Sequence, residues 1–163
     1  MTVTRSTVRD NRASFGGGIS NGAGGTTKLK RTTVRDNTAS ARGGGIFNDF
    51  VGNTTITLSD SAVHHNSAAQ GGGVFNTGTA SLSNTRVYAN TAGSGAGITA
   101  DVDSVMTLIR SFVERNTATL SPGPGGGGIL AISGGSVALE RSRVRHNQPD
   151  NCAPPGAVQG CTG

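Results

Sequence analysis

The sequence predicts an all-β fold, a right-handed parallel β-helix (solenoid) of about six coils with a disulfide-stapled C-terminal loop. An apolar residue followed three positions later by asparagine occurs at Val8/Asn11, Val34/Asn37, Val63/Asn66, Val87/Asn90, Val113/Asn116 and Val144/Asn147. Ser or Thr lies five positions before each of these asparagines, and Val or Leu lies eight positions before. The pattern recurs at intervals of about 24 to 31 residues, as in solenoids whose repeats bury their apolar faces on one another.

The composition is compatible with a solenoid and excludes an ordinary layered domain. Aromatic residues make up 4% and hydrophobic residues 33% of the 163 positions, which is little material for one large core. The 27 glycines would also fit a disordered chain. However, a disordered chain has no reason to keep Leu, Ser/Thr, Val and Asn at fixed offsets, so we expect an ordered array.

Each repeat is expected to contain short strands joined by corners. In one repeat, Ile56 and Leu58 alternate with polar residues, which is the period of a half-buried strand. The parity then changes between Leu58 and Ser61 and again between Val63 and Asn66, so a corner is predicted in each interval. Parallel crossovers favour right-handed winding.

Glycine clusters occupy a fixed place in five repeats. They are Gly16-Gly17-Gly18-Ile19, Gly43-Gly44-Gly45-Ile46, Gly71-Gly72-Gly73-Val74, Gly95-Ala96-Gly97-Ile98 and Gly126-Gly127-Gly128-Ile129. The apolar residue is expected to begin the third strand of its coil, because glycine permits a sharp turn and close packing. A phosphate-binding loop is the functional alternative, but it requires a Lys-Ser/Thr pair after the glycines, which is missing here.

The recurring asparagines are expected to be structural. Asn11, Asn37, Asn66, Asn90, Asn116 and Asn147 would stack as an amide ladder, and asparagine also tolerates a left-handed corner. A second, shorter ladder is predicted from Asn21, Asn48 and Asn76. It should end there, because Ala100 and Ala131 take the next two places.

The motifs at Gly43 to Asn48 and Val34 to Asn37 resemble the GGA(I/V) and FxxN repeats of polymorphic outer-membrane proteins. More broadly, the chain is similar to secreted right-handed parallel β-helix proteins of the pectate-lyase-like superfamily. The resemblance covers about residues 1–148 and has Val where those repeats favour Phe. It implies an extracellular or surface module, and it identifies no reaction.

The chain divides into β-helix repeats at 1–148 and a C-terminal tail at 149–163, where the repeat register breaks. Cys152 and Cys161 are the only cysteines and flank Pro154-Pro155-Gly156. A disulfide between them would cap the last coil and would fit an oxidising, secreted or cell-surface setting. A metal or redox pair is the alternative, but no histidine ligand or Cys-x-x-Cys spacing accompanies it.

The other end of the chain is expected to lie inside a coil, because Met1 falls in register with Ile56, Met106 and Val137. An unpaired strand edge is then predicted around Thr2 to Thr4. We expect this edge to pair with another copy or with upstream coils. The sequence has no apolar segment long enough for a membrane span.

Three outward rows are predicted beside the Asn ladder, six, four and two residues before each ladder asparagine. The first holds Arg5, Arg31, Asp60, Asn84, Arg110 and Arg141; the second, Thr7, Thr33, Ala62, Arg86, Phe112 and Arg143; the third, Arg9, Arg35, His64, Tyr88, Glu114 and Arg145. We call these rows the basic flank, since they hold nine of the 14 Lys and Arg of a chain with net charge +5.

The basic flank is the candidate binding surface. Arginines can form paired hydrogen bonds to carboxylates or sulfates, so the predicted partner is an acidic polysaccharide or cell-surface glycan. The binding residues would be Arg110, Arg141, Arg143, Arg145, Tyr88 and Phe112. A solvated charged face is the alternative, and no motif supports nucleic acid.

An enzyme of the polysaccharide lyase class is a further alternative, with His64, Tyr88, Arg86 and Asp60 as weak catalytic candidates. Against catalysis, Asp101 and Asp103 are too few for a calcium site, and no metal or other cofactor is expected. An ice-binding face would need an unbroken outward Thr row, which Lys28 and Ala138 interrupt. The sequence therefore favours a structural or binding module over an enzyme.

Overall fold

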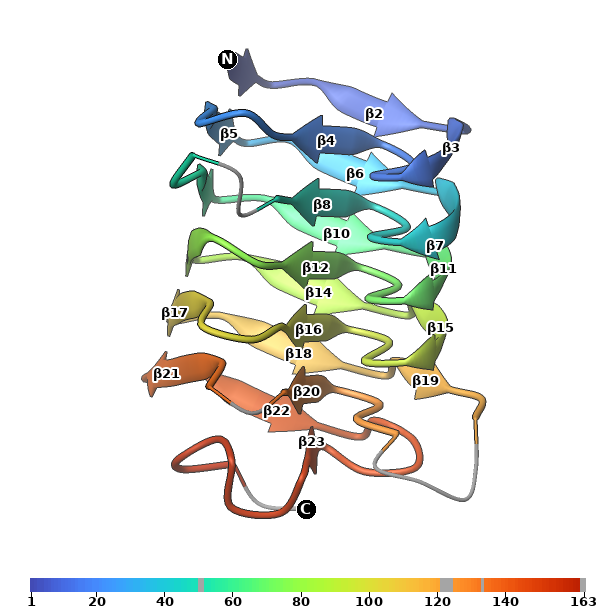
Figure 1. Ribbon diagram of the computed structural model, residues 1–163, viewed down its shortest axis with the longest axis vertical. Helices are drawn as coiled ribbons and strands as arrows, with labels where there is room; N and C mark the ends of the chain where they lie inside the picture. The colour runs from blue at the N-terminus through green and yellow to red at the C-terminus, as the bar shows by residue number, and fades with distance from the viewer. Residues whose placement is uncertain (50–51, 121–124, 133, 162–163) are drawn as a thin grey trace.

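The computed structural model is a parallel β-solenoid of about six coils, with the two chain termini at opposite ends of the stack (Figure 1). It describes residues 1–49, 52–120, 125–132 and 134–161. Within these ranges the secondary structure consists of strands β1 to β23, with no helix. The predicted all-β solenoid and its coil number are confirmed, and right-handed winding follows the general rule for parallel crossovers.

The strands form four parallel sheets, because equivalent strands of successive coils pair with one another. Sheet A contains β1 (Thr2–Thr4), β5 (Thr26–Lys30), β9 (Thr55–Ser59), β13 (Thr79–Ser83), β17 (Val105–Ile109) and β21 (Ser136–Glu140). Sheet B contains β2 (Thr7–Arg9), β6 (Thr33–Arg35), β10 (Ala62–His64), β14 (Arg86–Tyr88), β18 (Phe112–Glu114) and β22 (Arg143–Arg145).

The other two sheets complete each coil. Sheet C contains β3 (Arg12–Phe15), β7 (Thr38–Arg42), β11 (Ser67–Gln70), β15 (Thr91–Ser94) and β19 (Thr117–Ala118). Sheet D contains β4 (Ile19–Asn21), β8 (Ile46–Asn48), β12 (Val74–Asn76), β16 (Ile98–Ala100), β20 (Ile129–Ala131) and β23 (Cys152–Ala153).

Sheet C corrects the predicted order of strands. The apolar residue after each glycine cluster begins the fourth strand of its coil rather than the third. Sheet C was missed because its strands carry Ala, Ser and Gly instead of branched apolar residues, and because its register shifts between β3 and β7 and between β7 and β11. Apolar and polar residues therefore alternate only weakly in the segments that form sheet C.

The core is built from columns of identical or similar side chains. Leu58, Leu82 and Leu108 are paired in one register across β9, β13 and β17, and all three are fully buried. Val63 and Val87 form the equivalent column in sheet B. Each middle coil thus packs on two neighbours, as expected for a nearest-neighbour stack.

The corners around sheet B use left-handed backbone conformations in non-glycine residues. Before each strand of sheet B the φ angles lie between 47° and 52°, as at Asp60, and after it between 51° and 59°, as at His65. The predicted corners are confirmed. However, the left-handed residue is the one before the ladder asparagine, not the asparagine itself, whose side chain points into the stack.

The Asn ladder holds the coils together. The side-chain oxygen of Asn90 accepts hydrogen bonds from the backbone and side-chain amides of Asn66, both at 3.0 Å, and the Asn90 amide donates to the carbonyl of Val63 at 3.1 Å. The same pattern repeats along the column. The second ladder is also confirmed, since the Asn21 side-chain amide donates to Asn48 and that of Asn48 to Asn76 at 2.7 Å.

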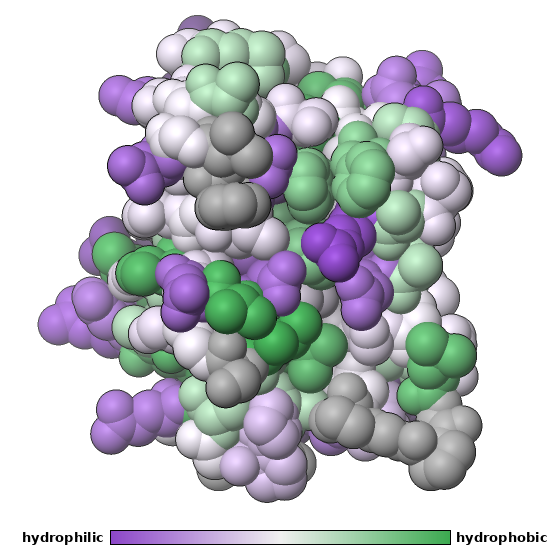
Figure 2. Space-filling model, viewed as in Figure 1, coloured by the Kyte–Doolittle hydropathy of each residue, from purple (hydrophilic) through white to green (hydrophobic). Residues whose placement is uncertain are grey.

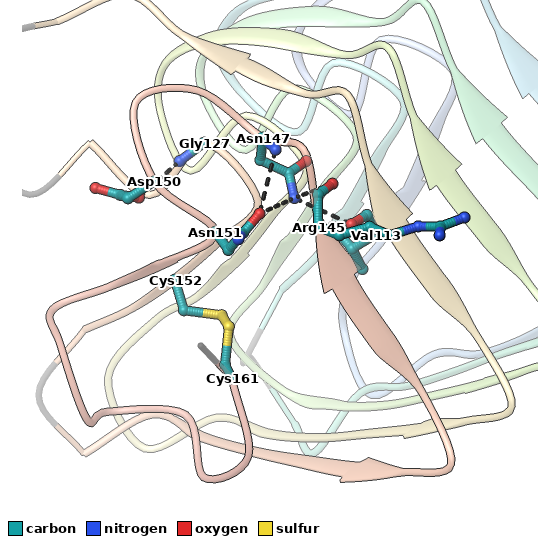
Figure 3. The surroundings of a disulfide bond; sticks show 8 residues. All are labelled: Val113, Gly127, Arg145, Asn147, Asp150, Asn151, Cys152 and Cys161. Carbon is teal, nitrogen blue, oxygen red and sulfur yellow. Dashed lines mark hydrogen bonds between the residues drawn. A yellow bond between two sulfur atoms is a disulfide. The ribbon is translucent and has the colours of Figure 1, made fainter. Parts of the chain in front are cut away.

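The C-terminal tail closes its end of the stack (Figure 3). The predicted disulfide between Cys152 and Cys161 is present, and hydrogen bonding continues past residue 148, because β23 pairs with β20. Asn151 lies where other coils have the third glycine, and its side-chain oxygen accepts from the backbone and side-chain amides of Asn147 at 3.2 and 3.1 Å. The tail therefore extends the Asn ladder by one member.

A membrane-spanning helix is not found in the part of the chain that the structure describes.

Candidate functional site

The basic flank lies on the outer face of sheet B and at the corner that precedes it. The outward rows are confirmed by the strand register, which aligns Arg86 with Phe112 and Arg143, and Tyr88 with Glu114 and Arg145. Because the strands are only three residues long, the middle residue faces the core and its two neighbours lie on the outer face, where Glu114 alone among the residues of these three strands is covered by neighbouring side chains. The face is therefore two side chains wide and runs the length of the stack.

Two arginines near the N-terminal end of the flank are neutralised by a neighbouring aspartate. Arg9 forms an ion pair with Asp10 at 2.7 Å, and Arg35 forms the equivalent pair with Asp36. Both pairs join a residue of the outward row to the corner residue that follows it. These two arginines therefore present little unbalanced charge to a ligand.

Glu114 is the buried anion of the flank. Its side chain lies between Arg86, at 2.5 Å, and Arg145, at 3.1 Å, and is 4% exposed. The hydrogen bond from Arg86 and that from Arg145 hold the pKa of the Glu114 carboxyl below its ordinary value of 4.5, and they outweigh burial, which acts in the opposite direction. Glu114 stays ionised at neutral pH and orders two arginines from different coils.

The aromatic residues of the flank already have partners on their rings. Tyr88 stacks on His64 with 4.6 Å between ring centroids, and the Arg86 guanidinium lies 5.0 Å from the Tyr88 centroid. The Arg145 guanidinium lies 5.8 Å from the centroid of Phe112. A sugar would have to displace these contacts in order to stack on Tyr88 or Phe112, so the arginines are the better ligand-binding candidates.

Arg110, Arg141 and Arg143 provide the accessible cationic groups. All three are exposed, and the Arg110 side chain donates to Asn84 at 3.1 Å. Within the described part of the chain, the guanidinium groups of Arg141 and Arg143 form no hydrogen bond or ion pair. Stacked coils lie about 4.8 Å apart, so these arginines can act together on one polymer.

The weak catalytic candidates do not form an obvious acid–base pair. The rings of His64 and Tyr88 are stacked face to face, so their polar atoms do not bond to each other. Nδ1 of His64 instead contacts Nδ1 of His65 at 2.7 Å. Burial lowers the pKa of His64 below 6.5, aided by His65 and Arg35 and opposed by Asp36. Asp60 accepts a hydrogen bond from Asn84 at the opposite end of the strand.

A metal centre is also not apparent. Among the described residues, no group of three or more His, Cys, Asp or Glu side chains is placed to hold an ion. The catalytic roles of His64, Tyr88, Arg86 and Asp60 thus stay predictions.

Sequence reasoning missed a further column of the site. The corner after sheet B places a left-handed residue directly before each ladder asparagine, and in the last two coils these residues are Arg115 and His146. Both are exposed beside the outward rows. Their fixed position next to the ladder is a signal in the sequence, but asparagine also tolerates a left-handed corner, which draws attention away from the residue before it. Arg115 adds a fifth arginine to the C-terminal part of the flank.

Comparisons of the chain with protein-family models, with curated proteins and with solved structures find no match.

Proposed function

We propose that this chain is a secreted or cell-surface β-helix module whose basic flank binds an acidic polysaccharide. The observation that carries the proposal is the cluster of exposed arginines in the last two coils, namely Arg110, Arg115, Arg141, Arg143 and Arg145. The nearby carboxylate of Glu114 is buried between two arginines and leaves the others unbalanced. A polymer with regularly spaced anions can contact several stacked coils at once.

We propose that the protein acts outside the cell. A disulfide persists in oxidising compartments, and Cys152 and Cys161 form one. The glycine and Val-x-x-Asn motifs resemble those of secreted β-helix proteins of the pectate-lyase-like superfamily. The first coil also has an open edge at β1, which we propose pairs with another copy or with upstream coils of the same repeat.

The test is retention on a polyanion column. Arg141→Glu combined with Arg143→Glu should elute from a heparin-like or polyuronate matrix at clearly lower salt than the parent chain, because two accessible cations become anions. Neither side chain has a hydrogen-bond or ion-pair partner among the residues that the structure describes, so the melting temperature should change little.

The matched control is Lys28→Glu combined with Lys30→Glu, which alters net charge equally on the outer face of sheet A. Equal loss of retention in both double variants would show that total charge, rather than the flank, determines binding, and the proposal would fail. Incubation with polyuronates, monitored for the ultraviolet absorbance of an unsaturated product, separates a binding module from a lyase.

A further inference from the structure

All three histidines of the chain lie on the basic flank or at the corner beside it. His64 is the last residue of β10 and belongs to an outward row, whereas His65 and His146 occupy the corner that follows sheet B. Figure 2 shows the face that carries sheet D, where hydrophobic and hydrophilic residues lie side by side. The described strands of sheet D contain no histidine, lysine or arginine. Histidine ordinarily changes its charge between about pH 5 and 8, so the flank is the face whose charge responds to mild acid.

His64 and His65 form a hydrogen-bonded pair. Their Nδ1 atoms lie 2.7 Å apart, so one of these atoms carries the hydrogen and the other accepts it. A proton taken up at Nε2 of the donor ring preserves this bond and makes it charge-assisted. A proton on the second ring would remove the acceptor. The pair is therefore expected to gain a single positive charge in mild acid.

The charged and titratable groups around this pair come from the coil before it and the coil after it. The preceding coil supplies the ion pair of Arg35 and Asp36. The following coil supplies Tyr88, whose ring is stacked on His64 and also contacts the Arg86 guanidinium. Burial lowers the pKa of His64, as do its partner histidine and Arg35, whereas Asp36 raises it. His64 therefore becomes charged only in mildly acidic solution.

His146 lies in the most basic part of the flank. It directly follows Arg145 and stands beside Arg115 of the preceding coil. The nearby carboxylate of Glu114 is bound by two arginines, and that of Asp150 in the tail accepts a hydrogen bond from a backbone amide at 3.2 Å. Both carboxylates thus already have partners. A proton on His146 adds to a patch of positive charge that an acidic polymer would neutralise.

On the premise that the basic flank binds an acidic polysaccharide, we propose that mild acid strengthens this binding by charging His64, His65 and His146. His146 enlarges the arginine cluster of the last two coils. The histidine pair adds a cation in the middle of the stack, where Arg35 is neutralised by Asp36. The cationic surface then extends from β10 to β22. Because coupling between two ligands is reciprocal, a polymer that binds more tightly to the protonated flank must also draw protons onto it.

The test is binding of the folded chain to dextran sulfate, whose sulfate groups stay ionised in mild acid, at about pH 7.5 and about pH 5. The affinity should be about three- to tenfold higher at the lower pH, because each added cation contributes modestly to binding at an exposed surface. Binding at an intermediate pH should also take up protons. Calorimetry measures this uptake as a binding heat that varies with the ionisation enthalpy of the buffer.

A triple variant locates the effect. His64→Gln, His65→Asn and His146→Asn remove the titrating rings, and asparagine suits the last two positions because their φ angles are 54° and 55°. The triple variant should bind as the parent does at about pH 7.5 and gain nothing in acid. The matched control adds Thr57→His and Ser81→His on the outer face of sheet A to the triple variant. These two histidines should not restore the gain.

The outcomes separate the pH response from the binding itself. Equal affinity of the parent at both pH values, or a gain in acid that persists in the triple variant, overturns the proposed response and leaves the polysaccharide-binding function in place. Restoration by the histidines of sheet A would show that net charge rather than the flank determines the response, and would overturn it as well. Absence of binding at both pH values would overturn the binding function and the pH response together.

Discussion

The two ends of the stack differ in how their last coil is covered. At the C-terminal end, Val158 is 2% exposed beneath the last coil, and the disulfide between Cys152 and Cys161 fixes the loop that carries it. At the N-terminal end, Val3 and Val8 are only partly buried, and Phe15 is 47% exposed. In a stack, a side chain contributes according to how many of its neighbours are present. The same residue type should therefore matter most in the middle, less at the covered end and least at the open end.

The largest effect is expected in the middle of the stack. Leu82 is fully buried and lies between Leu58 and Leu108, so Leu82→Ala removes packing on two interfaces. It should lower the free energy of unfolding by about 2 to 5 kcal/mol. In a nearest-neighbour stack it should also uncouple the two halves, which would appear as a second transition in denaturant unfolding.

Two controls sharpen this prediction. Ser81→Ala alters the outward neighbour of Leu82 and should change stability by at most about 0.5 kcal/mol. Val8→Ala removes a partly buried side chain from the open first coil and should cost clearly less than Val87→Ala at the equivalent, fully buried position. A cost for Leu82→Ala as small as that for Ser81→Ala would mean that the inward column is wrongly assigned.

The disulfide should have the next largest effect. Cys152→Ser with Cys161→Ser should lower the free energy of unfolding by about 2 to 3 kcal/mol, because the crosslink restricts the unfolded chain. The loss of stability should appear first as faster amide hydrogen exchange in the C-terminal coils, while the amides of the N-terminal coils stay protected. Loss of protection spread evenly over all coils would contradict the assignment of the disulfide to one end. Without reduction, alkylation should modify neither cysteine.

The sequence was most informative where the repeat is strict. Leu82 and Asn90 recur at fixed offsets from their counterparts, so their inward positions follow from counting. Sheet C was missed because small residues such as Ala68 and Gly93 give no clear alternation. The role of Asn151 was not predictable from spacing, since it follows Asn147 by four residues rather than a full repeat.

The candidate sites show the same division. The outward rows of the flank follow from the repeat, and the structure keeps them. The ion pairs of the flank do not follow from the repeat. The position of Glu114 between Arg86 and Arg145 depends on side-chain length and on burial by neighbouring coils.

A smaller effect is expected at the ends of the Asn ladder. Asn151→Ala leaves the backbone amide of Asn147 without its side-chain acceptor and removes one of the three acceptors of the Asn147 side-chain amide, so it should cost about 1 kcal/mol. Asn11→Ala should cost less, since Asn11 is exposed and its side-chain oxygen has no coil above it in this chain. Urea unfolding of both variants, compared with Asn90→Ala in the middle, would rank the three positions. An equal cost for all three would show that the contribution of a ladder asparagine to stability does not depend on how many neighbouring coils it contacts.

The smallest expected effect is the pH dependence of stability, which should differ between the C-terminal coils and the open N-terminal end. The pKa of Glu114 is lower in the folded chain than its ordinary value of 4.5, so its ionised form contributes stability above that value, and the contribution is lost as the pH falls through the folded pKa. Because Glu114 joins Arg86 to Arg145, the loss should be confined to the C-terminal coils. Glu114→Gln should lower stability at pH 7 and reduce its dependence on pH below about 4.5.

The exposed pair of Arg9 and Asp10 provides the control, since Asp10→Asn at the open end should change stability by less than about 1 kcal/mol. An acid titration in which both variants behave alike would place the pH dependence outside the Glu114 ion pairs.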